Sequence, residues 1–328
     1  MRTHLSSNAV AGACLVSLVA LIGMSSPANA QSYPDKPIHL ISPSPPGGGT
    51  DTTARLVANK VTELTKWQFV VDTRPGAGGN IGLNIGAKSA ADGYTLVMGE
   101  TSNLTVNQYL YKHPPLDPEK ELTPVSLIGR GALVFVVRAD KPYKTLGDVV
   151  AASRKSQMSF ASSGSGTVGH LVTESFKKKS GAQFLHVPYK GAGPAMTDLL
   201  GGQVDVYFAS LTAALPMVKT GKLKALAVTS TERIPSLPDV PTLAESGFPG
   251  LDYYVIYGLV APARTPAAVV SALNREVNRA LKTPELKVGL MDRGVEAMPM
   301  TPDEFGAYLT KERARWRVVV KDSGATVD

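Results

Sequence analysis

The residues best suited to chemistry lie in four glycine-bearing loops, each of which precedes a helical pattern. These loops cover residues 42–51, 74–82, 162–170 and 189–195. In the third loop Gly164, Gly166 and Gly169 form the pattern G-x-G-x-x-G, which is the fingerprint of a dinucleotide-binding site. The chemistry to test is therefore the binding of an anion at the start of a helix.

The context of this pattern does not fit a dinucleotide. The strand predicted after the helix, FLHVPYK at 184–190, contains no acid for a ribose hydroxyl, and the next acid is Asp198. A P-loop is also excluded, because an alanine, residue 87, separates Gly86 from Lys88. We expect neither a nicotinamide cofactor nor any other cofactor.

The four loops share a simpler physical property. A helix start offers unpaired N–H groups and about half a positive charge, so it binds phosphate or carboxylate without a charged side chain. Several hydroxyl groups in or near the loops add further donors: Thr50, Thr101, Ser102, Ser162, Ser163, Ser165 and Thr167. A small carboxylate is the ligand that this chemistry favours, although glycines in such loops can also serve only as tight turns.

Signals for catalysis are weak. No G-x-S-x-G surrounds Ser163 or Ser165, and the histidines at 39, 113, 170 and 186 have no metal-ligand spacing. His170 lies in the first turn of its predicted helix, where a role in the cleft competes with packing or capping. Asp51 is favoured as a helix cap over a ligand contact, and for Asp205 the two roles compete evenly. We expect neither a catalytic residue nor a metal site.

Residues 1–30 have the pattern of a secretory signal peptide. An apolar stretch, residues 9–22, follows Arg2 and is too short for a spanning helix, and Ala28-Asn29-Ala30 forms an A-x-A cleavage site. We predict cleavage after Ala30 and a periplasmic location. Cleavage removes Cys14, the single cysteine, so disulfides and thiolate chemistry are excluded from the mature chain. The formal charge of +7 is scattered along the sequence, which disfavours nucleic acid as a partner.

Short apolar runs alternate with helical patterns from residue 36 onward, and the alternation restarts after residue 138. Such an alternation predicts an α/β protein with mostly parallel sheets and two Rossmann-like lobes. The last third contains a strand-like segment, residues 251–262, and then only helices, which we expect to pack on the first lobe through Phe305, Leu309, Trp316 and Val320. We predict that residues 31–130 and 254–328 form lobe 1, that residues 131–253 form lobe 2, and that two crossing segments form a hinge.

Several segments, in this order, resemble one protein family. They are YPDKPIHLISPSPPGGGTD, RPGAGGNIG, DGYTLVMG, VPYKGAGPAMTDLLGGQVDVYF, KLKALAVTS, LPDVPTLAESG and YGLVAPARTP. Together they are similar to the periplasmic solute receptors of tripartite tricarboxylate transporters, the Bug receptors, over nearly all of residues 33–328. The resemblance implies a type II periplasmic-binding-protein fold, no catalysis, and delivery of an organic acid to a large and a small integral-membrane subunit. We expect a monomer.

The resemblance also implies ligand-binding positions, at which main-chain amides and hydroxyls hold carboxylate groups. Carried over to this chain, with His170 added on its chemistry, the candidates are Pro46, Gly47, Gly48, Thr50, Asp51, Gly78, Gly79, Thr101, Ser102, Asn103, Ser163, Gly164, Ser165, Gly166, Thr167, His170, Gly191, Ala192, Gly193 and Asp205. Three further residues, Tyr253, Tyr254 and Tyr257, are candidates either for stacking on an aromatic ligand or for core packing.

The leading hypothesis is thus a two-lobe receptor that closes on a dicarboxylate, a tricarboxylate or an aromatic acid. One alternative is an exported hydrolase that uses Ser163 or Ser165 with His170. The other is a sensory ligand-binding partner of a membrane signalling protein, which fits the same fold.

Overall fold

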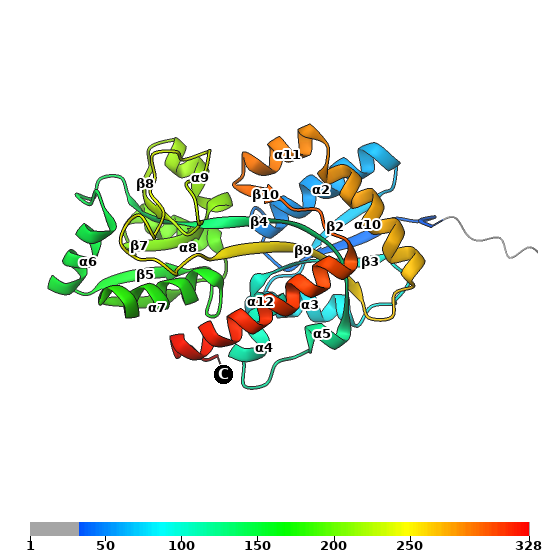
Figure 1. The fold of residues 1–328 in the computed structure, drawn as a ribbon, viewed down its shortest axis with the longest axis horizontal. Helices are drawn as coiled ribbons and strands as arrows, with labels where there is room; N and C mark the ends of the chain where they lie inside the picture. Colours follow the sequence, from blue (N-terminus) through cyan, green and yellow to red (C-terminus); the bar gives the residue numbers. More distant parts are fainter. Residues whose placement is uncertain (1–32, 328) are drawn as a thin grey trace, which may run out of the picture. The chain divides into compact units, whose positions relative to one another are not determined.

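A single mixed β-sheet organises residues 33–327, the part of the chain that the computed structural model describes (Figure 1). The predicted signal peptide, its cleavage site and Cys14 lie outside the described residues. The sheet has the strand order β2-β1-β3-β9-β4-β7-β5-β6, and β8 and β10 each pair with β4. Its strands are β1 (Ile38–Ser42), β2 (Phe69–Thr73), β3 (Thr95–Glu100), β4 (Leu122–Arg138), β5 (Met158–Ser162), β6 (Phe184–Pro188), β7 (Val206–Ser210), β8 (Leu223–Val228), β9 (Tyr254–Pro262) and β10 (Val295–Ala297).

The sheet is parallel at both ends and antiparallel in the middle. Strand β1 pairs in parallel with β2 and β3, and β5 pairs in parallel with β6 and β7. Each antiparallel pair among the described strands contains β4 or β9. The predicted β/α alternation therefore builds the two parallel ends, and the two crossing segments are the strands that join them.

Strand β4 changes partners along its length. Residues 122–132 pair with β9, and residues 133–138 pair with β7 and β8. We call the strands β1, β2, β3 and β10 the first half of the sheet and β5, β6, β7 and β8 the second half. We propose that these halves are the cores of the two lobes, with the bounds predicted above.

Helices connect the strands and cover the sheet. They are α2 (Gly49–Thr65), η1 (Ala77–Gly79), α3 (Asn80–Ala87), η2 (Ser102–Val106), α4 (Asn107–Leu110), α5 (Pro118–Glu121), α6 (Leu146–Lys155), α7 (Val168–Ser180), α8 (Ala192–Gly201), α9 (Leu211–Lys219), α10 (Ala267–Leu281), α11 (Pro284–Met291) and α12 (Pro302–Ser323). Helix α2 illustrates why these segments are helical. Its buried residues Ala54, Val57, Ala58 and Val61 recur at helical spacing, and Lys66 ends the helix in the left-handed conformation.

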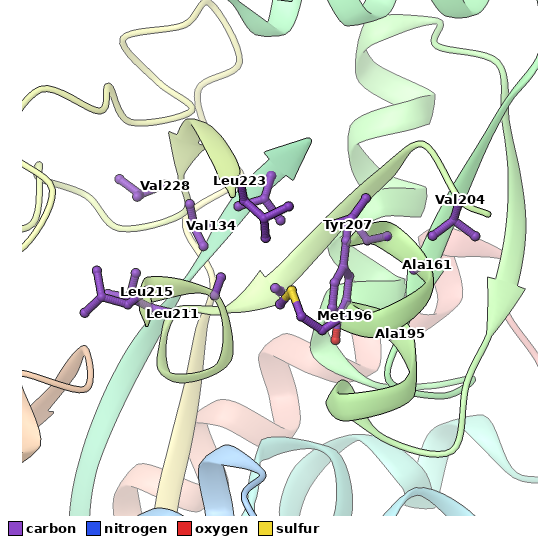
Figure 2. Close-up of a cluster of buried hydrophobic side chains, with 14 of the residues drawn as sticks. Val134, Ala161, Ala195, Met196, Val204, Tyr207, Leu211, Leu215, Leu223 and Val228 are labelled. Atoms are coloured by element: carbon purple, nitrogen blue, oxygen red, sulfur yellow. The ribbon is translucent and has the colours of Figure 1, made fainter. Parts of the chain in front are cut away.

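Two hydrophobic clusters fill the space between sheet and helices. In the second half, side chains from β4, β7, β8, α8 and α9 pack together, and Figure 2 shows Val134, Tyr207, Leu211 and Leu223 among them. In the first half, a second cluster joins Ile41, Val97 and Ile256 to Phe305 and Leu309 of α12. Each half therefore has its own buried core.

The C-terminal helices pack on more than the first half. Helix α12 begins with a capping box of Thr301 and Glu304 and contacts β4 and η2, as expected, but it also contacts α7 of the second half (Figure 1). The four predicted face residues Phe305, Leu309, Trp316 and Val320 are buried. The short elements α5, α11 and β10 carried too little periodicity to be predicted from the sequence.

Candidate functional site

A cavity of about 480 Å³ lies where loops from both halves meet the central strands. Its floor includes Leu133 of β4 and Val255 and Tyr257 of β9, and its walls are the glycine-bearing loops. Gly191 of the second half lies so close to the first half that a Cβ atom there would come within 2.9 Å of Pro45 Cγ. Both halves therefore contact whatever occupies the cavity.

Every wall loop follows the carboxyl end of a strand. Strand β1 leads into α2, β2 into η1 and α3, β5 into α7, β6 into α8, and β7 into α9. Within each half the carboxyl ends of the parallel strands share one edge, so the helices that follow them begin at that edge. The parallel strands of the two halves run in opposite directions, and the loops after them reach the cavity from both sides. This topology places five helix starts around one cavity.

These five helix starts have no side-chain cap. The residues before α2, α3, α7, α8 and α9 are Gly48, Gly79, Thr167, Gly191 and Ser210, and none makes a capping hydrogen bond with its side chain. The first backbone N–H groups of α2, α7, α8 and α9 are consequently available to a ligand, whereas those of α3 donate to the carbonyl groups of Gly76 and Ala77. Aligned peptide dipoles add partial positive charge at the same points, so the cavity favours an anion.

Eleven of the twenty predicted site residues line the cavity. They are Gly48, Thr50, Gly78, Gly79, Ser102, Ser163, Gly164, Ser165, Thr167, Gly191 and Ala192. They come from all four predicted loops and from the loop after β3, so the structure brings together segments far apart in the sequence. The other nine do not line the cavity in the structure: Pro46, Gly47, Asp51, Thr101, Asn103, Gly166, His170, Gly193 and Asp205.

In the first half, three of the nine residues that do not line the cavity form hydrogen bonds that fix the segments beside it. The Asp51 carboxylate accepts a hydrogen bond of 3.0 Å from Gly47 N–H, which lies before α2, and pairs with Arg55. It therefore fixes the loop before α2, and the helix cap predicted from the sequence is not formed. Thr101 accepts a hydrogen bond from Ile256 N–H through its hydroxyl group. Asn103 Oδ1 accepts one from Glu100 N–H. Pro46 and Gly47 are exposed.

In the second half, Asp205 lies at the wrong edge of the sheet for a ligand contact. It comes directly before β7, whereas the cavity lies at the carboxyl end of that strand. Its Oδ2 atom accepts hydrogen bonds from the Ser159 N–H at 2.9 Å and the Ser159 hydroxyl at 3.0 Å, which is the structural role considered from the sequence. Gly193 is exposed.

His170 does not line the cavity, but it fixes the third loop, which does. Its Nδ1 atom accepts a hydrogen bond of 3.1 Å from Gly166 N–H, and its ring stacks on His186 with centroids 4.0 Å apart. Burial, followed by the positive charge of Lys177, lowers the pKa of His170 to about 4. The pKa of His186 is also lowered to about 4, by burial and then by His170. Neutral rings therefore fix this loop near neutral pH.

Sequence reasoning missed Glu100, an acid that lines the cavity. It is the last residue of β3, and its Oε2 atom accepts a hydrogen bond of 2.8 Å from the Thr50 hydroxyl. Burial raises the pKa of its carboxyl group, and the hydrogen bond from Thr50 opposes this. A signal was present, because Glu100 ends a predicted strand at the edge where the loops gather.

Other lining residues were also absent from the predicted set. They include Tyr189 and Lys190 of the loop after β6, Phe208 and Ser210 of β7, and Tyr111 after α4. Of the three tyrosines considered for stacking, Tyr257 lines the cavity, whereas Tyr253 packs on Trp316 and Tyr254 accepts a hydrogen bond from Thr231 N–H.

The arrangement does not resemble a hydrolase site. Ser163 shares a hydrogen bond of 2.6 Å with the Tyr207 hydroxyl rather than with a histidine. The hydrogen-bonded Ser162 and His186 do not line the cavity. Residues 33–327 contain no group of three or more His, Cys, Asp or Glu side chains placed to hold a metal ion. Within the same residues, each helix is too short or too polar to cross a membrane.

Comparison with known proteins agrees with this geometry. Residues 53–325 match the model of the tripartite tricarboxylate transporter family receptor. Protein BugT of Bordetella pertussis is 37% identical over 310 residues, which cover 94% of this chain and 95% of BugT.

Two solved structures are similar along their whole length. R. palustris Rpa4515 with adipate has a TM-score of 0.87 and 34% identity, and the match covers 90% of this chain and all of that one. MatC of Rhodopseudomonas palustris with bound malate has a TM-score of 0.82 and 30% identity, with 88% and 100% covered.

The solved structure of periplasmic binding protein BugD has a TM-score of 0.85 and 31% identity, with 90% of this chain and 99% of that one covered. The chain therefore has the periplasmic-binding-protein fold and is a receptor, not an enzyme. The hydrolase alternative is thereby excluded. On the family match and on its similarity to BugT, the chain belongs to the family of tripartite tricarboxylate transporter receptors of the Bug type.

Proposed function

We propose that this receptor captures a small organic carboxylate in the cavity and delivers it to a tripartite membrane transporter. The observation that carries the proposal is the convergence of five uncapped helix starts on one cavity. The adipate and malate bound to the two structural neighbours support a carboxylate as the ligand class. We assign the ligand contacts to the eleven cavity-lining residues given above.

Binding would close the two halves on the ligand. A ligand that contacts both walls stabilises the closed form by the difference between its affinities for the closed and open forms. Short contacts between the halves, such as Gly191 against Pro45, are the kind of contact that a closed form makes. The transporter then recognises the closed form, and its large and small integral-membrane subunits are the proposed partners of a monomeric receptor.

The proposal includes export. The chain would reach the periplasm through the signal peptide of residues 1–30, with cleavage after Ala30. N-terminal sequencing of the protein purified from a periplasmic extract should begin at Gln31. A mature protein that still carries Cys14 would contradict this part of the proposal.

Binding of acids and of their amides tests the function. The purified receptor is unfolded, freed of bound ligand and refolded, and its thermal unfolding is followed with dicarboxylates, tricarboxylates, aromatic acids and their matched amides. An acid at 100 times its Kd should add about 2.7 kcal/mol to the free energy of unfolding, whereas its amide should add nothing. The amide is the matched control, because it keeps the carbon skeleton and removes the charge.

The result that would overturn the proposal is a receptor that binds the amides as well as the acids, or that binds no acid. A pull-down with the two membrane subunits, with and without the acid that binds, then tests delivery. Retention of the receptor only in the presence of that acid is the expected result.

A further inference from the structure

The cavity contains a carboxylate of its own, which is unusual for a site that favours anions. Among the lining residues Glu100 is the only acid, and Lys190 is the only base. Glu100 comes from β3 and stands opposite Tyr257 in the register of β3 with β9, so it lies beside the cavity floor. A ligand that fills the cavity from the helix starts to the floor must meet this side chain.

Half of the Glu100 carboxylate has no partner. Oε2 accepts the hydrogen bond from Thr50, but no donor in residues 33–327 reaches Oε1. No basic side chain of these residues forms an ion pair with Glu100. Oε1 is not one of the buried polar atoms that lack a partner, and Glu100 lines the cavity, so this oxygen is open to a donor on a ligand.

The nearby phenol groups do not supply a donor to Oε1. The Tyr207 hydroxyl is engaged with Ser163, and the Tyr257 hydroxyl with Thr212. Burial raises the pKa of both phenols, and the negative charge of Glu100 adds to this. A donor to Glu100 Oε1 can therefore come from a ligand in the cavity.

A ligand carboxylate cannot take this place at low energetic cost. Two ionised carboxylates facing one another in a poorly solvated site repel strongly. Protonation of Glu100 would remove the repulsion, and burial favours it by raising the pKa of this carboxyl group. The Thr50 hydroxyl group and the positive end of α2, of which Thr50 is the second residue, oppose it by favouring the charged form. A ligand group that donates a hydrogen bond resolves the conflict without a change of protonation.

We propose that Glu100 is a specificity residue that accepts a hydrogen bond from a hydroxyl or ammonium group of the ligand, while the helix starts hold the ligand's carboxylate. The inference rests on the proposed function and narrows it. The substrate class is then hydroxy acids or amino acids, and a simple dicarboxylate with a carboxylate at the floor is disfavoured.

Calorimetric titration with matched acids tests this inference. The refolded receptor is titrated with hydroxy acids, amino acids, unsubstituted monoacids and dicarboxylates of graded length, with the donor near or far from the carboxylate. At least one hydroxy or amino acid should bind about tenfold or more tightly than the monoacid and the dicarboxylate of the same length, because a site built around a polar partner rejects ligands that lack it. Comparison of the hydroxy acids with the amino acids identifies whether the donor is a hydroxyl or an ammonium group.

Glu100→Gln is the diagnostic variant, with Glu285→Gln as its control. The first removes the charge at the cavity with little change of shape and should lower the preference for the donor-bearing acid by about tenfold. The second removes the same charge from an exposed side chain that pairs with Lys60, and it should leave the preference unchanged. If Glu100→Gln fails to fold, the comparison of acids in the wild-type receptor decides alone.

Three outcomes would overturn the inference. One is a wild-type receptor that binds a dicarboxylate at least as tightly as every donor-bearing acid of its length. The second is an unchanged preference in Glu100→Gln. The third is proton uptake with a dicarboxylate, measured in buffers of different ionisation heat, since Glu100 would then be protonated and donate. In each of these cases acids still bind, so the proposed function is unaffected. If no acid binds, both the proposed function and the inference about Glu100 are wrong.

Discussion

Helix starts at the cavity differ from those elsewhere in the same fold. Away from the cavity, the side chains of Asp117, Thr145, Thr283 and Thr301 accept hydrogen bonds from backbone N–H groups at the starts of α5, α6, α11 and α12. At the cavity, the five helix starts lack such caps. A side-chain cap satisfies an N–H group that would otherwise be free for a ligand. The comparison teaches that stability and binding compete for the same backbone donors.

One helix shows the limit of this rule. Helix α10 begins after Pro266 without a side-chain cap, although it does not line the cavity. An uncapped start is therefore not a site by itself. The site arises because β1 and β2 in the first half, and β5, β6 and β7 in the second half, lead into five uncapped helix starts around the same cavity.

The largest expected effect is a loss of stability at low pH that comes from His170. Its ring accepts a hydrogen bond from Gly166 N–H in the loop before α7, a start that has no side-chain cap. The pKa of His170 is about 4 in the folded chain against 6.5 for the free side chain. Between pH 4 and pH 6.5 the unfolded chain therefore binds a proton that the folded chain does not. Stability should be full above pH 6.5 and fall as the pH drops to about 4, by roughly 3 kcal/mol for His170. Denaturant unfolding across this pH range measures the decline.

The variant His170→Gln should reduce this decline, because glutamine does not titrate, and the part that remains comes from His186. Its control is His39→Gln, at an exposed histidine that pairs with Asp72 on the first half. A decline that is the same in His170→Gln as in the wild-type receptor would show that the loop does not depend on a neutral ring.

The next effect concerns the approach of the two halves at the start of α2. A Cβ atom on Gly49 would come within 2.7 Å of the Tyr257 hydroxyl and 3.5 Å of Thr212 in α9. Gly49→Ala should weaken ligand binding by about ten- to a hundredfold, as overpacking at a closed contact costs about 1–3 kcal/mol. Calorimetry with the acid that binds best measures the loss. Gly289→Ala, where a Cβ atom meets nothing within 4 Å, should bind as the wild-type receptor does.

Equal affinities in the two glycine variants would mean that binding does not require this contact between the halves. The comparison of the five helix starts would then describe a preformed cavity rather than one that closes.

Much of the fold was predictable because periodicity is local. The alternation of apolar runs and helical patterns located β1, α2, β5, α7 and their neighbours in both halves. Strand β4 was not recognised as one continuous element, because its role in both halves follows from pairing with β7, β8 and β9, which are distant in sequence. Long-range pairing leaves little trace in a short window of sequence.

The candidate site was predictable to the level of loops. Glycine and hydroxyl residues before helices marked the walls, but which of them face inward depends on the path of each loop. Gly166 and Gly164 are two residues apart, yet only Gly164 lines the cavity, because the Gly166 N–H turns to His170. Glu100 was missed because a lone acid at a strand end acquires its role only from the surfaces that surround it.

A smaller effect is expected at a capped start far from the cavity. Thr301→Ala removes the side chain that accepts a hydrogen bond from Glu304 N–H at the start of α12. The free energy of unfolding should fall by about 1 kcal/mol, the usual loss for an N-cap threonine, while the Kd for the acid stays unchanged. Chemical denaturation and calorimetry on the same preparation separate the two quantities. A weaker Kd would show that α12 couples the halves through its contact with α7.

The smallest effect is the reverse of the one expected for Thr301→Ala: a change of binding without a change of stability. It tests most directly the comparison between helix starts at the cavity and those elsewhere. Ser210 precedes α9, lines the cavity and makes no capping hydrogen bond, so Ser210→Ala removes a cavity hydroxyl without removing a cap. Stability should change by less than about 0.5 kcal/mol, whereas binding should weaken by about two- to fivefold, the net value of one hydrogen bond. If Ser210→Ala instead destabilises the chain as much as Thr301→Ala does, the two kinds of helix start are equivalent, and the absence of caps at the cavity has no functional meaning.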